Sequence, residues 1–256
     1  MENTLLVGLS RQVALERQID VIANNMANVN TTGFKSEKSL FEQFLLTNAN
    51  DQNFQGTDQR VSFVQDRGTW HDFAQGPTQR TGNPLDVVID GNGFIAVQAP
   101  GGAERYTRNG ALQVNNAGQL VTSDGNPVLG TSGPITLQPG DSEITIADDG
   151  TVTVRENGNT KVDSIRGKIR LVSFDQPQLL TKAGGSLFAA PATQTAQPAT
   201  NSRLIQGAVE GSNVSAVGEM TKMVEVMRTY TNIASLLQQQ NDLQKTAIER
   251  LADVPA

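Results

Sequence analysis

The stretch Ala23–Lys35 reads ANNMANVNTTGFK, and it ends an amphipathic segment with four asparagines followed by a glycine. Asparagine disfavours a helix interior, and glycine readily adopts the backbone angles of a turn. The apolar residues of the segment are spaced alternately four and three apart, which places them on one face of a helix. We therefore expect a helix over residues 1–30 that gives way to a turn here. The apolar face contains Leu15, Ile19, Ile22 and Met26.

Asn24 and Asn28 lie four residues apart on the helix face opposite the apolar one. A side-chain amide both donates and accepts hydrogen bonds, so this uncharged face suits contact with a second neighbouring helix. Fraying into the turn at Gly33 is the alternative, and it accounts well for Asn30. We expect an interface at Asn24 and Asn28, with fraying as the competing interpretation.

The C-terminal region carries a second helical pattern. From Glu219 onward the sequence has no glycine, and its one proline is Pro255. Apolar side chains recur at helical spacing, which predicts a helix over about residues 215–251. Ser212 and Asn213 precede this segment and are candidate N-cap residues. The apolar stripe includes Met220, Met223, Val224, Met227, Tyr230, Ile233 and Leu237.

The middle of the chain holds more than half of its 24 glycines. Asp-Gly pairs begin at residues 90, 124 and 149, and Asn-Gly pairs begin at residues 92, 109 and 157. Each pair stands beside a short apolar run, a pattern typical of β-hairpins. Residues 168–174 have the composition of a further strand. The middle is therefore predicted to be rich in β-structure.

Few residues are available for catalysis or metal binding. The chain has no cysteine, and His71 is its one histidine. A zinc site would need carboxylates almost alone, and the spacing around Asp90 does not fit a calcium-binding loop. The sequence has neither a phosphate-binding loop nor a G-x-S-x-G nucleophile motif. We expect no catalytic, cofactor or metal site, and we expect His71 at the surface or at a strand edge.

The charge and hydropathy patterns restrict the partners. A net charge of −6 argues against a nucleic-acid or anionic-membrane surface. No apolar run approaches the roughly 20 residues that cross a bilayer, so we expect no membrane insertion. The first residues lack the pattern of a signal peptide, so we expect synthesis in the cytoplasm without a cleaved signal.

These patterns predict a mainly β central domain and a discontinuous, coiled-coil-like helical domain formed by the N- and C-terminal helices. The expected terminal helical assembly domain comprises residues 1–30 and 215–256. Residues 31–75 are expected to connect it to a β-rich outer domain over residues 76–214. Pairing of two distant helices is feasible because the entropy cost of loop closure rises slowly with loop length.

Several segments, in order, resemble the flagellar basal-body rod and hook proteins. Residues 23–35 resemble the N-terminal hallmark of that family, and the resemblance extends over nearly the whole chain. The further segments are LDVVIDGNGF at 85–94, RYTRNGAL at 105–112, GQLVTSDGNPVLG at 118–130, EGSNV at 210–214 and EMTKMVEVMRTY at 219–230.

The resemblance implies a structural axial subunit that is not an enzyme and that self-assembles through its terminal helices. It implies homotypic and heterotypic contacts with other rod subunits, and passage through the flagellar type III export apparatus. It places the protein in the basal body, in the rod that crosses the periplasm. The chain length and residues 67–86 resemble proximal rod subunits. A distal rod subunit, or less favourably a β-rich carbohydrate-binding module, is the alternative.

The expected assembly interface combines the two helical patterns with the family-like stretch. Its residues are Leu15, Ile19, Ile22, Asn24, Asn25, Met26, Asn28, Gly33, Phe34, Met220, Val224, Met227, Tyr230 and Leu237.

Overall fold

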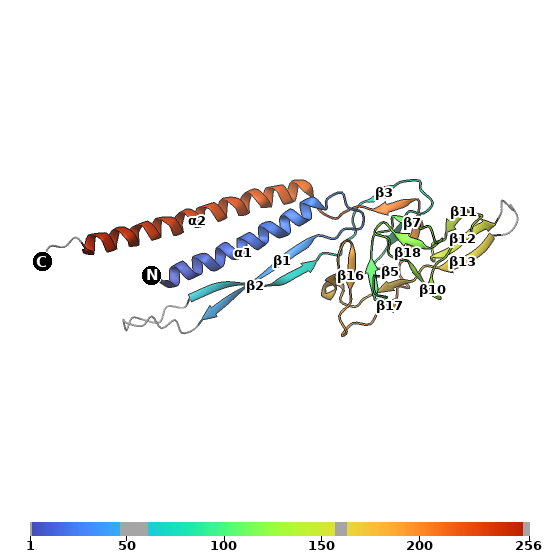
Figure 1. The fold of residues 1–256 in the computed structure, drawn as a ribbon, viewed down its shortest axis with the longest axis horizontal. Helices are drawn as coiled ribbons and strands as arrows, with labels where there is room; N and C mark the ends of the chain where they lie inside the picture. Colours follow the sequence, from blue (N-terminus) through green and yellow to red (C-terminus); the bar gives the residue numbers. More distant parts are fainter. Residues whose placement is uncertain (1, 47–60, 157–162, 253–256) are drawn as a thin grey trace. The chain divides into compact units, whose positions relative to one another are not determined.

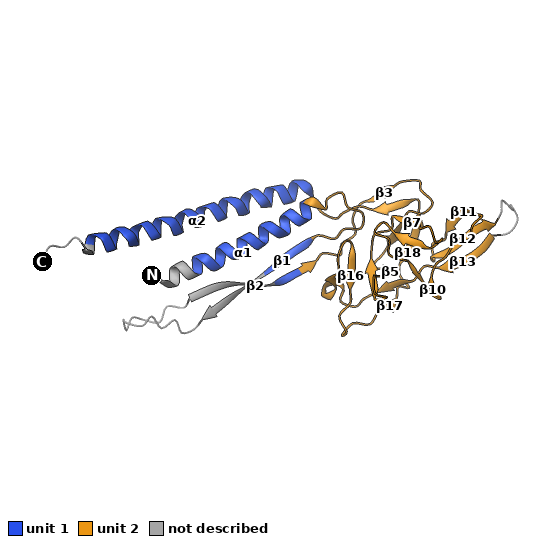
Figure 2. Cartoon of the chain, in the orientation of Figure 1, with its two compact units in different colours: residues 1–26, 37–69, 215–256 blue, residues 27–36, 70–214 orange. Residues whose placement is uncertain are grey.

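The computed structural model describes residues 2–46, 61–156 and 163–252 of the chain (Figure 1). The described residues form a mainly β protein with one helix near each end, which confirms that part of the predicted fold class. The chain divides into two compact units (Figure 2). Unit 1 contains residues 1–26, 37–69 and 215–256, and unit 2 contains residues 27–36 and 70–214.

Both predicted helices are present. Helix α1 spans Glu2–Ala27 and ends within the asparagine-rich stretch. Helix α2 spans Ala216–Ala252. The hydroxyl of Ser215 accepts a hydrogen bond from the Gly218 amide at 3.3 Å, so Ser215 caps α2. The N-cap prediction at residues 212 and 213 was wrong, because their side chains bond to backbone groups outside the helix.

Unit 1 also contains a strand pair, β1 (Glu37–Leu46) and β2 (Val61–His71). The last two residues of β2 belong to unit 2. The sequence predicted only a connecting segment here, over residues 31–75. A strand is stabilised by the partner with which it pairs, and local sequence gives a weak signal of that pairing.

Unit 2 is built from antiparallel sheets. The largest has six strands in the order β15-β16-β6-β5-β14-β17. These strands are β15 (Thr181–Lys182), β16 (Leu187–Ala189), β6 (Glu104–Thr107), β5 (Phe94–Gln98), β14 (Leu171–Ser173) and β17 (Gln197–Pro198). A three-stranded sheet contains β11 (Asp141–Ile146), β12 (Thr151–Glu156) and β13 (Asp163–Lys168).

Four smaller strand pairs complete unit 2. They are β4 (Val87–Asp90) with β18 (Arg203–Gln206), β3 (Thr78–Arg80) with β19 (Ala208–Glu210), β7 (Leu112–Val114) with β8 (Leu120–Thr122), and β9 (Leu129–Gly130) with β10 (Gly133–Pro134). A short 3₁₀ turn, η1, spans Pro177–Leu179.

The turn dipeptides gave mixed results. The Asp-Gly pair at 149 joins β11 to β12 in an antiparallel hairpin, as predicted. The pairs at 90 and 92 lie between β4 and β5, which do not pair with each other, so the hairpin prediction was wrong there. The partner of β4 is β18, from much later in the chain. The pair at 157 lies outside the described residues. The predicted strand at 168–174 is divided, with β13 ending at Lys168 and β14 beginning at Leu171.

Strand β5 separates two hydrophobic clusters in unit 2. Ile95 and Val97 point into an aliphatic cluster, whereas Phe94 and Ala96 point into an aromatic one. This division follows from the alternation of side chains along a strand. His71 is buried, with its ring centroid 5.2 Å from that of Phe188 in the aromatic cluster. The prediction of a surface or strand-edge histidine was therefore wrong about its burial.

Candidate assembly interface

The apolar stripe predicted along α2 divides into a covered face and an exposed face within unit 1. Val226 is only 6% exposed, and Tyr230 and Leu237 are half-buried. A second set of apolar residues is spaced three, four and three apart, which places the set on another face of the helix. We call this set the exposed stripe; its members are Val217, Met220, Val224 and Met227, at 76%, 53%, 51% and 52% exposure.

The covered face of α2 contacts α1. The Gln12 side-chain amide donates a hydrogen bond to the Tyr230 hydroxyl at 2.9 Å. A Cβ atom added at Gly8 would lie 2.6 Å from Cδ2 of Leu237, so the missing side chain of Gly8 leaves room for Leu237. The predicted interface residues Tyr230 and Leu237 are therefore engaged within unit 1.

The predicted apolar face of α1 is also largely covered. Ile22 is 3% exposed, and Leu15, Ile19 and Met26 are half-buried. Because this face is largely covered in the isolated chain, it differs from the exposed stripe of α2, although the sequence assigned both to one interface. The sequence stripe also omitted Val226, which is the most buried apolar residue of α2.

Among the asparagines, the structure buries Asn25, which is 2% exposed. Its side-chain oxygen accepts the Glu37 amide at 2.8 Å, and its side-chain nitrogen donates to the Glu37 carbonyl at 2.8 Å. The same nitrogen lies 3.4 Å from Oε2 of Glu219 at the start of α2. One amide thus connects α1, β1 and α2. In contrast, Asn24 is exposed, and the half-buried Asn28 accepts the Thr31 hydroxyl at 3.1 Å.

Replacement of Asn25 by alanine should destabilise unit 1. The change removes both hydrogen bonds between the Asn25 side chain and the Glu37 backbone, at a cost of about 1–3 kcal/mol, while alanine recovers only a few tenths through helix propensity. Urea unfolding followed by circular dichroism at 222 nm measures the net loss. Asp20→Ala, at an exposed position of the same helix, is the matched control and should be neutral or slightly stabilising. Equal stabilities of the two variants would contradict a role for the Asn25 bonds.

Gly33 and Phe34 lie in unit 2, where both are buried. The amide of Gly33 donates to the Glu210 carbonyl at 2.8 Å. A Cβ atom at Gly33 would lie 2.4 Å from the backbone nitrogen of Asn109, so only glycine fits without a shift. The ring of Phe34 lies under the Lys182 ammonium, with 5.1 Å between Nζ and the ring centroid. Both residues therefore secure the segment after α1 within unit 2.

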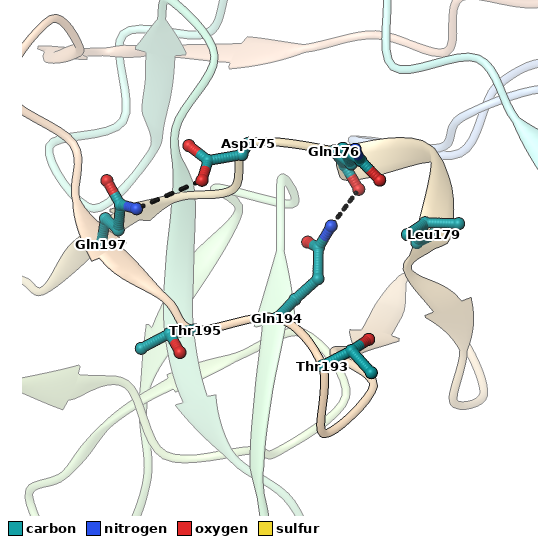
Figure 3. Close-up of a pocket in the computed structure, with 7 residues that line it drawn as sticks. All are labelled: Asp175, Gln176, Leu179, Thr193, Gln194, Thr195 and Gln197. Carbon is teal, nitrogen blue, oxygen red and sulfur yellow. Dashed lines mark hydrogen bonds between the residues drawn. The ribbon is translucent and has the colours of Figure 1, made fainter.

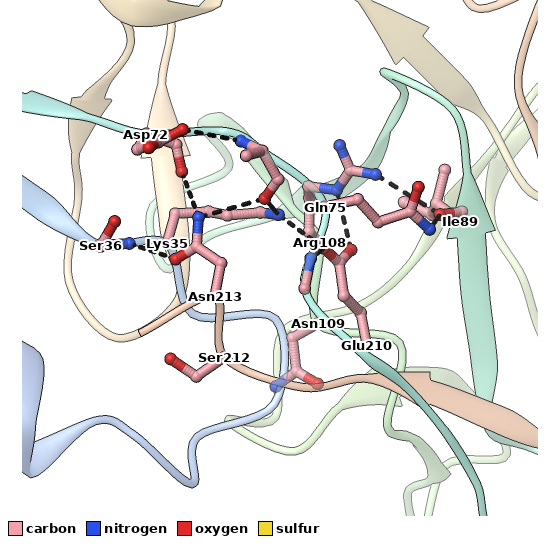
Figure 4. A network of polar contacts seen from close by, with 12 residues as sticks. Lys35, Ser36, Asp72, Gln75, Ile89, Arg108, Asn109, Glu210, Ser212 and Asn213 are labelled. Carbon is pink, nitrogen blue, oxygen red and sulfur yellow. Dashed lines mark hydrogen bonds and ion pairs between the residues drawn. The ribbon is translucent and has the colours of Figure 1, made fainter. Parts of the chain in front are cut away.

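A buried group of three charges lies next to these residues (Figure 4). Oε1 of Glu210 accepts the Lys35 ammonium at 2.6 Å and the Gly76 amide at 2.8 Å. Oε2 of Glu210 accepts Nε of Arg108 at 3.0 Å. The Lys35 and Glu210 side chains are fully buried, and that of Arg108 is 1% exposed. Burial lowers the pKa of the Lys35 ammonium, and the Glu210 carboxylate opposes this shift.

No pattern in the sequence marks these three charged residues as a buried group. Lys35 and Glu210 both lie inside segments that carry the family resemblance, but a charged residue among polar neighbours gives no periodic signal of burial. Their proximity arises from the packing of segments that are distant in sequence.

Three family models of known proteins match parts of the chain. Residues 5–35 match the family model "Flagella basal body rod protein", residues 88–154 match "Flagellar hook protein FlgE/F/G D1 domain", and residues 205–250 match "Flagellar basal body rod FlgEFG protein C-terminal".

Curated relatives match over most or all of the chain. The flagellar basal-body rod protein FlgF of Caulobacter vibrioides is 40% identical over 255 residues, which cover 99% of this chain and 100% of that one. This chain belongs to the flagellar basal-body rod protein family. FlgF of Mesorhizobium japonicum is 36% identical, with 98% of each chain covered. The rod protein FlgG of Buchnera aphidicola subsp. Baizongia pistaciae is 32% identical over 85% of this chain and 87% of its own.

In this member of the rod family, the buried charges connect all three matched regions. Lys35 is the last residue of the first region, Arg108 lies in the second and Glu210 lies in the third. The ion pairs and hydrogen bonds of Glu210 therefore join regions that are separate in sequence.

Unit 2 of this rod-family chain also has an open polar cleft of about 360 Å³ (Figure 3). Gln194 donates to the Gln176 carbonyl at 3.0 Å, and Gln197 donates to the Asp175 carboxylate at 3.3 Å. Asp175 is the single ionisable residue among those that line the cleft. Within the described parts of the chain, no group of three or more potential metal ligands is present, and no helix is long and apolar enough to cross a membrane.

Proposed function

We propose that this chain is a structural, non-enzymatic subunit of the proximal part of the flagellar rod, and that it assembles with other rod subunits through its terminal helices. The proximal assignment is supported by the full-length matches to proteins named FlgF, at higher identity than the FlgG match described above. The resemblance of the sequence to proximal rod subunits points the same way. Export through the flagellar type III apparatus and a place in the periplasm-crossing rod are part of this proposal.

The exposed stripe of α2 is the observation that carries the assembly proposal. Its four apolar side chains are each more than half exposed in the isolated chain, yet they share one helix face. Large apolar groups gathered on one face mark a protein contact, because burying them removes apolar surface from water. A helix of a neighbouring rod subunit, with its own apolar stripe, is the partner that fits this surface.

The carbohydrate-binding alternative has weaker support. It requires an exposed platform of several aromatic rings. Trp70 is 37% exposed, but Tyr106 is 7% exposed and the half-buried Tyr230 has its hydroxyl bonded to Gln12. No aromatic residue lines the cleft shown in Figure 3.

Met227→Asp tests the proposal. The side chain is 52% exposed in the isolated chain, so the substitution should leave the unfolding free energy of the monomer within about 0.5 kcal/mol. In an assembled rod it would bury an unpaired carboxylate at every copy of the contact, at a cost of about 3–5 kcal/mol for each. We expect loss of rod assembly and of swimming, measured by electron microscopy of basal bodies and by motility agar.

The matched control adds a carboxylate elsewhere on the same helix. Asn232→Asp introduces it at an exposed position outside the exposed stripe, and that variant should assemble. Normal rods in cells that carry Met227→Asp would refute assembly through this face.

A further inference from the structure

Three segments of unit 2 are joined by polar contacts, and we call this site the junction (Figure 4). The first, residues 33–36, follows α1, and the second, residues 210–213, precedes α2. The Gly33 amide donates to the Glu210 carbonyl at 2.8 Å, and the Ser36 amide donates to the Asn213 side chain at 2.8 Å. The third, residues 72–76, bonds to both, because the Ala74 carbonyl accepts from Lys35 and from Asn213.

The charges in this junction do not balance without Glu210. Lys35 and Arg108 are both cationic and buried, and the Glu210 carboxylate lies between them with one oxygen on each. Arg108 is also held by the carbonyl groups of Gly91 and Ile89, at 2.6 and 3.4 Å, so it belongs to the body of unit 2. Asp72 attracts Lys35 less strongly than Glu210 does. Residues 27–36 therefore place a lysine beside a buried arginine, and the later segment supplies the main counter-charge.

We propose that Glu210 is a positioning residue that makes docking of residues 27–36 conditional on docking of residues 208–214, so that the segment that follows α1 is docked only when the segment that precedes α2 is in place. Its importance for assembly rests on the rod function proposed above; the conditional docking itself does not. Without the carboxylate, the positive charges of Lys35 and Arg108 face each other in a site that excludes water. Lys35 then moves out of the site, and the residues on either side of it undock from unit 2.

Glu210→Gln tests the docking in the purified monomer. The amides of Gly33 and Ser36 donate across the junction, so their hydrogen exchange reports docking directly. We expect their exchange to accelerate about a hundredfold or more, while the amides of β5 and β6 remain protected. Glu104→Gln is the matched control, because Glu104 pairs with Arg170 at a partly exposed site of the same unit. Unchanged exchange at Gly33 and Ser36 in Glu210→Gln would overturn the proposal.

The double variant Lys35→Met, Glu210→Gln separates charge balance from simple packing. Removing the lysine charge leaves Arg108 with a neutral amide neighbour, so protection at Gly33 and Ser36 should recover at least about tenfold relative to Glu210→Gln. If Glu210 served only to fill space and accept hydrogen bonds, loss of the lysine as well would reduce protection further. Protection at Gly33 and Ser36 that is no higher in the double variant than in Glu210→Gln overturns the proposal, even if Glu210→Gln alone unfolds the whole unit.

The number of rods formed in cells is the last measurement. We expect few rods with Glu210→Gln and more with the double variant, so that rod number increases with the exchange protection of Gly33 and Ser36. Normal rod formation by a Glu210→Gln chain whose segment is undocked would overturn the positioning role. That result would leave the rod function intact, since the function itself is tested by Met227→Asp.

Discussion

Replacement of Ile22 by aspartate should unfold the helical part of unit 1 in the isolated monomer. Ile22 is 3% exposed, so the change removes a buried apolar side chain and places an unpaired carboxylate in its site. We expect a loss of about 3–5 kcal/mol in the unfolding free energy of that unit. Hydrogen exchange of α1 and urea unfolding followed at 222 nm both measure it, and cells that carry the variant should not swim.

Val13→Asp is the control, because it adds the same charge to the same helix at a site that is 45% exposed. It should leave the stability of the monomer close to that of the parent. If hydrogen exchange in α1 were unchanged in the Ile22→Asp monomer, Ile22 would not be buried in solution as it is in the structure. The two aspartate variants should differ in the step that they impair. Ile22→Asp should destabilise the monomer, whereas Met227→Asp should leave the monomer stable and prevent only rod assembly.

The helical part of the fold was predictable because helix signals are local. Long segments without glycine, with apolar residues at helical spacing, gave α1 and α2 close to their observed limits. Spacing alone did not show which apolar face is covered inside the subunit and which is exposed. Val224 and Val226 are both apolar and lie two residues apart, yet the first is 51% exposed and the second 6%. Their spacing does not encode which face of α2 is covered once the chain folds.

The β-structure was predictable in kind but not in pairing. The Asp-Gly pair at 149 formed its hairpin because both strands are adjacent in sequence. The partner of β4 is β18, more than 100 residues later, and no local turn signal encodes that pairing. For the same reason, the sequence did not predict the burial of Asn25 and Glu210. Polar residues of this kind are buried only when distant segments supply their hydrogen-bond partners.

Replacement of Gly33 by alanine should destabilise unit 2 by about 2–5 kcal/mol, through two separable causes. The backbone of Gly33 has a φ of +68°, which any residue with a Cβ atom adopts at a cost of about 1–2 kcal/mol. In addition, the new Cβ atom would lie 2.4 Å from the backbone nitrogen of Asn109 and 2.6 Å from the carbonyl carbon of Arg108. Neither backbone atom can move away without also displacing Arg108, whose side chain binds Glu210. Thermal and urea unfolding measure the total loss.

Gly82→Ala isolates the first cause, because Gly82 has a similar φ of +73° and nothing lies within 4 Å of an added Cβ atom. That variant should lose only the conformational part, about 1–2 kcal/mol. The excess loss in Gly33→Ala then measures the packing of residues 33–36 against the strand region that carries Arg108. If both variants lost the same stability, this segment would not be docked in solution as the structure has it, and the close approach of Gly33 to Asn109 would not form.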